Sequence, residues 1–119
     1  MRDVNDVVAV VPDLFFQSRI LSVARSCGRQ VSFAAKSDEV DFKLALVDLD
    51  APQSIETISA LRLSSRAPII AFGPNVDTEK RKAARVAGAD RVLAKSKLVT
   101  ELPRLLGGNL PQDRAGAPR

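Results

Sequence analysis

The sequence contains no histidine, tryptophan or tyrosine, and only one cysteine. Without histidine, imidazole cannot serve as a general base, a proton shuttle or a metal ligand, so Ser-His-Asp and Cys-His catalysis are excluded. The single thiol, Cys27, cannot form an internal disulfide or a zinc site, and this usage is typical of a reducing compartment. At an apolar helical position, we interpret Cys27 as a small buried hydrophobic residue.

Long hydrophobic runs are also absent. The longest, Val7–Val11, is far shorter than the roughly 20 residues that span a bilayer. Residues 1–6 carry acids and no apolar segment, so they do not form a secretory signal, and we expect a cytoplasmic protein. The 119 residues, 45% hydrophobic and 27% charged, predict one globular domain over 1–106. Residues 107–119 lack apolar periodicity and predict a flexible tail or linker stub.

Short apolar runs alternate with longer segments of helical periodicity. Unbroken apolar runs predict strands that are buried on both faces. The predicted strands are Val7–Val11, Gln30–Ala34, Leu44–Asp48, Ile69–Phe72 and Arg91–Ala94.

Four segments between and after these strands have the spacing of amphipathic helices. The first ends at Gly28, the next has Pro52 in its first turn, and a third begins at Asp77 or Thr78. The last contains Pro103, which we place in its first turns. Only residues 35–43 separate the second and third strands, so a helix there must be short or absent. The side chains expected to face inward are Phe16, Ile20, Val23 or Ala24, Cys27, Ile55, Ile58, Leu61 or Leu63, Ala83, Val86, Ala87, Leu98, Val99, Leu102, Leu105 and Leu106.

Successive strand–helix units predict an α/β fold in which a parallel sheet carries helices on both faces. In such sheets the functional crevice lies at the carboxyl ends of the strands. The polar residues that follow those ends are Asp13, Asp48, Asp50 and Lys95.

Carboxylates and a lysine at one sheet edge are suited to Mg²⁺ and phosphoryl chemistry. Asp13, Asp48 and Asp50 are therefore candidate metal ligands, and Lys95 is the cation that would neutralise a phosphoryl group. Each residue also has a purely structural interpretation. Asp13 and Asp50 could cap the helices that follow them, and Lys95 could be a solvated residue at a strand end.

Four segments carry a resemblance to a known family. They are V-A-V-V-P-D at 8–13, L-V-D-L-D-A-P at 46–52, A-P-I-I-A-F-G at 67–73 and A-G-A-D-R-V-L-A-K at 87–95. Over residues 5–106 the chain resembles the response-regulator receiver domains (CheY-like) of two-component signal transduction. The resemblance implies a flavodoxin-like three-layer αβα sandwich with strand order 2-1-3-4-5. It also places Asp48 at the family's phosphoacceptor and Lys95 at its invariant lysine.

Four positions depart from the family pattern. Pro12 replaces one of the two acids after the first strand, and Gly73 replaces a Ser or Thr that binds the phosphoryl group. Val92 stands where the family has a switching aromatic residue, and Ser96 where it prefers proline. A ligand shifts an equilibrium only through contacts that differ between the two states. Without a hydroxyl at Gly73 and an aromatic ring at Val92, a phosphoryl group would make few such contacts. We therefore expect a degenerate or pseudo-receiver. It would act by protein–protein interaction, without enzyme activity and with weak Mg²⁺ binding at most.

Two alternatives belong to other functional classes. One is a working receiver that transfers a phosphoryl group from a donor to Asp48 with Mg²⁺. The other is a flavin or nucleotide binder of the same fold, although no glycine-rich phosphate loop follows the first strand.

Positive charge is concentrated between residues 77 and 97, where seven cations stand against three acids in a chain of net charge +4. We expect Lys80, Lys82, Arg85 and Arg91 to form a face for a protein partner, namely a histidine kinase, an output domain or another signalling protein. The alternative is a solvated helix side. Nucleic acid is not expected, because Tyr and Trp for base stacking and a helix-turn-helix pattern are missing.

Overall fold

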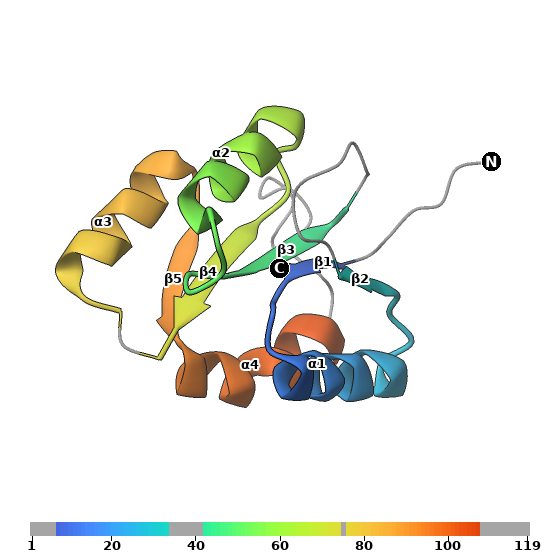
Figure 1. The fold of residues 1–119 in the computed structure, drawn as a ribbon. Coiled ribbons are helices and arrows are strands. Elements are labelled where there is room, and N and C mark those ends of the chain that lie inside the picture. Colours follow the sequence, from blue (N-terminus) through green and yellow to red (C-terminus); the bar gives the residue numbers. More distant parts are fainter. Residues whose placement is uncertain (1–6, 34–41, 75, 108–119) are drawn as a thin grey trace.

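The computed structural model describes residues 7–33, 42–74 and 76–107, which form a parallel sheet between two layers of helices (Figure 1). The sheet has five strands in the order β2-β1-β3-β4-β5, as predicted. The elements, in chain order, are β1 (Val7–Val10), α1 (Leu14–Ser26), β2 (Val31–Phe33), β3 (Leu44–Asp48), α2 (Ser54–Ser64), β4 (Ile69–Gly73), α3 (Thr78–Ala87), β5 (Arg91–Ala94) and α4 (Lys95–Gly107).

The three central strands are buried at every position. Successive side chains of a strand point to opposite faces, so β1, β3 and β4 supply both layers of the core. On one face, Phe72 packs against Phe16 of α1, with ring centroids 5.3 Å apart. Cys27 is only partly buried and packs at the margin of this core.

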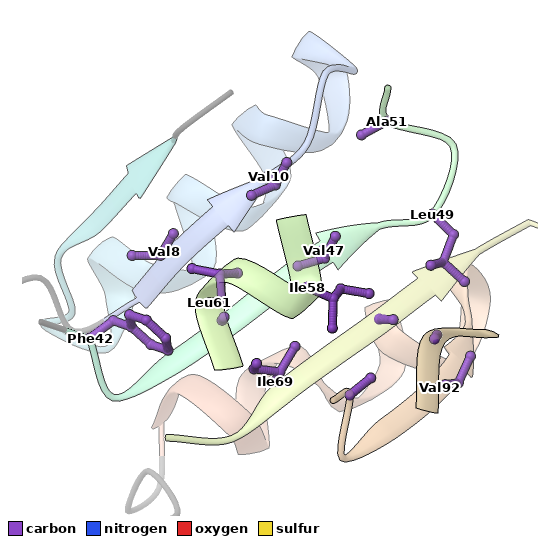
Figure 2. Packing of buried hydrophobic residues seen from close by; sticks show 14 residues of the cluster. Val8, Val10, Phe42, Val47, Leu49, Ala51, Ile58, Leu61, Ile69 and Val92 are labelled. Carbon is purple, nitrogen blue, oxygen red and sulfur yellow. The ribbon is translucent and has the colours of Figure 1, made fainter. Parts of the chain in front are cut away.

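Helices α1 and α4 lie side by side on one face of the sheet, and α2 and α3 cover the other (Figure 1). Figure 2 shows the core beneath α2 and α3, where Ile58 and Leu61 of α2 meet Val8, Val47 and other side chains of the sheet. Strands β3 and β4 lie between the two cores, so the position of their carboxyl ends is fixed by packing on both sides.

The orientation of α3 differs from the prediction. Ala84 is the buried residue of this helix, whereas Ala83 is exposed and Val86 is 83% exposed. The helix carries few apolar side chains, so polar anchors fix its rotation. Arg81 donates to the Val92 carbonyl at 2.9 Å, and the Asp77 carboxylate caps the helix by accepting from the Lys80 N–H.

Two prolines also differ from their predicted positions. Pro52 precedes α2, because the chain makes a tight turn before that helix begins. In this turn the Ala51 N–H donates to the Asp48 carbonyl, and Gln53 has a φ of 57°. Pro103 lies inside α4, and not in its first turns, because that helix begins directly at Lys95.

Three sequence predictions reach beyond the described residues. The short or absent helix at 35–43 falls mostly on 34–41, and the tail beyond Gly107 falls on 108–119, so both lie outside the described ranges. The domain boundary at 106 stays a prediction. Within the described ranges, every helix is too short or too polar to cross a membrane.

Arg62 joins the C-terminal end of α2 to the turn before β5. Its guanidinium donates twice to the Gly88 carbonyl, at 3.0 and 3.1 Å, and contacts the Asp90 carboxylate at 2.6 Å. It also donates to the carbonyls of Ser65 and Ala67, both at 3.1 Å. Gly88 is required here, since its φ is 128° and a Cβ would lie 2.8 Å from Arg62 Cβ.

We predict that Arg62→Ala destabilises the fold by about 2–3 kcal/mol, because three partly buried carbonyls lose their donors. Arg62→Lys should rescue little, since an ammonium cannot reproduce the planar fork. Exposed Arg66 is the matched control, and Arg66→Ala should stay within roughly 0.5 kcal/mol of wild type. Urea unfolding measures all three. Equal stability of the two alanine variants would contradict the assigned role of Arg62.

Candidate functional site

Asp48 ends β3 as a buried carboxylate, with only 6% of the residue exposed. Its Cα is paired with that of Phe72 in the parallel register, and its Oδ1 accepts a hydrogen bond of 2.9 Å from the Asp50 N–H. Burial raises the pKa of Asp48 above its ordinary value of 3.8, although the Asp50 N–H opposes this rise. Burying this charged group costs folding free energy, and the group lies at the carboxyl edge of a parallel sheet, where functional sites of such folds are found. Asp48 is therefore a strong functional candidate.

Asp13 and Lys95 form a contact beside Asp48. Asp13 caps α1, since its Oδ1 accepts from the N–H groups of Phe15 at 2.9 Å and Phe16 at 3.4 Å. Its Oδ2 lies 3.5 Å from Lys95 Nζ, which in turn lies 4.6 Å from the centroid of the Phe16 ring. The hydrogen bond from Phe16 is the largest cause that lowers the pKa of Asp13. The capping interpretation of Asp13 is therefore confirmed.

Asp50 does not cap the helix that follows it, contrary to that alternative. The residue at the N-cap of α2 is Gln53, and the Asp50 carboxylate lies 3.8 Å from Lys80 Nζ. Asp50 and Lys80 therefore connect the loop after β3 to the first turn of α3.

Magnesium binding at the candidate ligands stays a prediction, because Mg²⁺ needs only one or two carboxylates together with water. Among the described residues, no three carboxylate or thiol side chains gather closely enough to hold a metal. Asp13 faces Lys95 and the first turn of α1, and Asp50 faces Lys80. Pro12 adds no carboxylate at this edge. The structure thus brings Asp48, Asp13 and Lys95 to one edge without forming a three-carboxylate ligand set.

The residue that ends β4 could accommodate a side chain. A Cβ on Gly73 would lie 3.4 Å from Val76 Cγ2 and 3.8 Å from Leu49 Cβ, which are ordinary contacts. Its φ is not in the positive region that favours glycine. The surroundings of Gly73 therefore leave room for a Cβ at this position. Val92, by contrast, is buried in the core beneath α2 and α3.

The four residues of the predicted partner face have different surroundings. Lys82 and Arg85 are exposed on α3 and form no ion pair within the described ranges. Lys80 faces Asp50, and Arg91 contacts Glu101 of α4 at 3.2 Å. The free charge of this face therefore lies chiefly on Lys82 and Arg85.

Two features near the site are not among the sequence predictions. Phe16, expected only as a core residue, also holds the Lys95 ammonium. Leu14 and Phe15 are 72% and 88% exposed at the start of α1. The sequence contained that signal, because a helix that buries Phe16, Ile20 and Ala24 must direct the side chains just before Phe16 away from the core.

Comparison with solved structures identifies the architecture. The receiver domain protein (CheY-like) of Methanospirillum hungatei superposes with a TM-score of 0.71 at 20% identity, over 87% of this chain and 94% of that one. The chain has the fold of a receiver domain. The receiver domain of the TMAO respiratory system response regulator TorR gives a TM-score of 0.68 at 26% identity, over 86% and 96% of the two chains.

A third structure with the receiver fold is HP1043, an orphan response regulator of H. pylori. Its TM-score is 0.66 at 16% identity, and the match covers 89% of this chain and 99% of that one. No protein-family model and no curated protein matches the sequence. The predicted CheY-like fold is confirmed, and the resemblance to receivers is supported at the level of structure.

We predict that Asp48→Asn stabilises the protein at pH 7. Burial raises the folded-state pKa of Asp48, so the fold favours the protonated, neutral carboxyl group. The stability that this group contributes is complete below pH 3.8, and it is lost as the pH rises through the folded-state pKa and the carboxyl group ionises. Asparagine stays neutral and can keep the acceptor for the Asp50 N–H. Urea unfolding from pH 7 down to pH 3 should show the advantage at neutral pH and its disappearance in acid.

Asp13→Asn serves as the control of opposite sign. The pKa of Asp13 is lowered, so its charged form stabilises the fold above pH 3.8 and this contribution is lost in acid. The variant should therefore be less stable than wild type at pH 7. A destabilised Asp48→Asn at neutral pH would contradict the assigned cost of burying this carboxylate.

Proposed function

We propose that this protein is a receiver-like module of two-component signal transduction that acts by protein–protein interaction without a phosphorylation-driven switch. The observation that carries the proposal is the environment of Lys95. Its ammonium contacts the Phe16 ring and the Oδ2 of Asp13, whereas the hydrogen bonds that cap α1 use the Oδ1 of the same carboxylate. The cation that would neutralise a phosphoryl group on Asp48 already has partners.

The end of β4 supports the same proposal. A phosphoryl group on Asp48 would find no hydroxyl at Gly73. Val92 is buried, branched and apolar, so it offers no aromatic ring that could follow such a hydroxyl between two positions. A modification that makes no differential contacts has little effect on an equilibrium between two states.

Metal chemistry carries no step of this proposal. No three of the described carboxylates gather at one point, and Asp13 and Asp50 each have a lysine partner. Partner binding would depend instead on surfaces that are present without modification, including the basic face of Lys80, Lys82, Arg85 and Arg91.

A second candidate function, a phosphoacceptor receiver, is favoured by one observation. Asp48 is buried at the sheet edge at a cost to folding, and selection for stability alone would not keep a carboxylate there. In this alternative, the Asp48 carboxylate attacks the phosphorus of a small phosphodonor, the bond to the leaving group breaks, and an acyl phosphate forms.

We predict that incubation with acetyl phosphate and Mg²⁺ adds no stoichiometric phosphoryl group to the protein, because Gly73 and the engaged Lys95 leave the product without stabilising contacts. Intact-mass spectrometry measures the gain, and Asp48→Asn is the control for the site of modification. A gain of one phosphoryl group that Asp48→Asn abolishes would establish the second candidate instead.

Gly73→Thr tests the reason for this result. The space beside Gly73 accommodates a Cβ, so the variant should fold. If the missing hydroxyl limits the reaction, the variant should accept more label than wild type under the same conditions. Equal labelling of the two proteins would place the limitation elsewhere at the site.

We predict that reversing Lys82 and Arg85 to Glu slows association with an acidic protein partner more than it speeds dissociation, because exposed charges mainly steer the encounter. Surface plasmon resonance at about 50 and 300 mM salt measures both rates, and the difference should shrink at high salt. Arg66→Glu, a charge reversal at an exposed residue between α2 and β4, is the control. If the variant and wild type have the same rates at both salt concentrations, the basic face is only a solvated side of the helix and does not bind the partner.

A further inference from the structure

The last turns of the helices gather at the edge of the sheet opposite Asp48. Each helix runs back along the strand before it, so its C-terminal end lies where the strands begin (Figure 1). Hydrogen bonds join these ends. Arg62 of α2 donates to the Gly88 carbonyl after α3, and Arg29 Nε, before β2, donates at 2.9 Å to the Leu106 carbonyl of α4. We call the edge formed by residues 25–30, 43, 62–68, 85–91 and 104–107 the amino edge.

The amino edge is strongly basic. Its one carboxylate, Asp90, is engaged by Arg62 at 2.6 Å and by the Ile69 N–H at 2.8 Å. Every helix has an arginine in its last turn, where a cation offsets the helix dipole. That role does not explain Lys43 and Arg66, which lie outside the helices. The cations of the amino edge are Arg25, Arg29, Lys43, Arg62, Arg66, Arg85, Arg91 and Arg104.

Most of this positive charge is not neutralised by neighbouring acids. Five of the cations are exposed and form no ion pair with any described residue, namely Arg25, Lys43, Arg66, Arg85 and Arg104. Four of these five are arginines, whose planar guanidinium donates two parallel hydrogen bonds to a phosphate group. The amino edge is therefore suited to a partner that presents many phosphates.

Two large aliphatic side chains lie exposed among these cations. Leu63 of α2 is 89% exposed and Val86 of α3 is 83% exposed, and each is the residue before the last of its helix. The hydrogen bonds from Arg62 to the Gly88 carbonyl hold these two helix ends together. Single exposed apolar residues are common, but aliphatic side chains among unpaired cations match the interface of an anionic bilayer.

We propose that the amino edge binds the surface of an anionic lipid bilayer. Its free cations contact the lipid phosphates, and Leu63 and Val86 enter the boundary between headgroups and acyl chains. A nucleic acid also presents phosphates, but the amino edge contains no aromatic residue on which a base could stack. A nucleic acid would also leave Leu63 and Val86 without an apolar environment.

This surface lies opposite the edge that holds Asp48, Asp13 and Lys95 (Figure 1). Bilayer binding would therefore leave the edge with Asp48 open to solvent and would not require its modification. The inference goes beyond the proposed function, since it concerns attachment to a lipid surface and not the binding of a protein. Arg85 belongs both to the amino edge and to the basic face, so the test uses Arg66.

The test is co-sedimentation of the full chain with vesicles of phosphatidylcholine alone and with vesicles of equal parts phosphatidylcholine and phosphatidylglycerol. Wild type should bind only the mixed vesicles, and less strongly as salt rises. Arg66→Glu should lower the partition coefficient about tenfold or more, because a cation is replaced by a charge that the lipid repels. The double change Leu63→Ser and Val86→Ser should lower it about threefold or more. These side chains are exposed, so the variants should fold.

Two matched variants change the opposite part of the molecule. Arg19→Glu reverses an exposed arginine that forms no ion pair with a described residue and lies beside Lys95. It changes the net charge by the same amount as Arg66→Glu. Phe15→Ser removes an apolar side chain that is 88% exposed at the start of α1. Both variants should bind the mixed vesicles like wild type.

Several outcomes would overturn the proposal. One is equal binding of the two kinds of vesicle, and another is binding of neither. Equal losses for Arg66→Glu and Arg19→Glu would show that net charge alone attracts the protein and that no particular edge is used. Retention of single-stranded RNA that depends on Arg66, without vesicle binding, would assign the amino edge to a nucleic acid instead.

Discussion

Burial of the central strands on both faces is the constraint on which the rest of this structure depends. Every residue of β1, β3 and β4 is buried, and alternate side chains fill one of two cores. The strands therefore cannot shift by one residue without moving each side chain into the wrong core. That fixed register brings the end of β3, with Asp48, next to the end of β4, with Gly73.

Charge at this edge is arranged in pairs. Lys95 meets Asp13, and Lys80 meets Asp50. Each pair joins two elements that are far apart in the sequence, so the four side chains stabilise the edge in its unmodified form. These exposed pairs contribute little individually.

The surface of α3 and the surface between α1 and α4 differ in chemistry as well as position. On α3, exposed Lys82 and Arg85 lie beside exposed Val86, on a helix that is held mainly by polar anchors. Between α1 and α4, Phe15, Phe16 and Val99 lie among charged and hydroxyl side chains, including Arg19 and Lys95. The two surfaces lie on opposite faces of the sheet (Figure 1).

The amino-acid sequence by itself determined the number, order and type of the described strands and helices, because apolar periodicity and strand-end residues are local properties. It also determined that Asp13, Asp48 and Lys95 meet at one edge, since parallel strands all end there. Tertiary structure alone decided which carboxylate faces which lysine, because that depends on side-chain directions across elements. It also set the rotation of α3, where the bond from Arg81 to Val92 places Ala84 inward and leaves Val86 in solvent. Periodicity did not resolve this rotation, since Ala83, Ala84, Val86 and Ala87 lie on neighbouring sides of the helix, and the contacts of α3 with α2 and β5 place Ala84 inward.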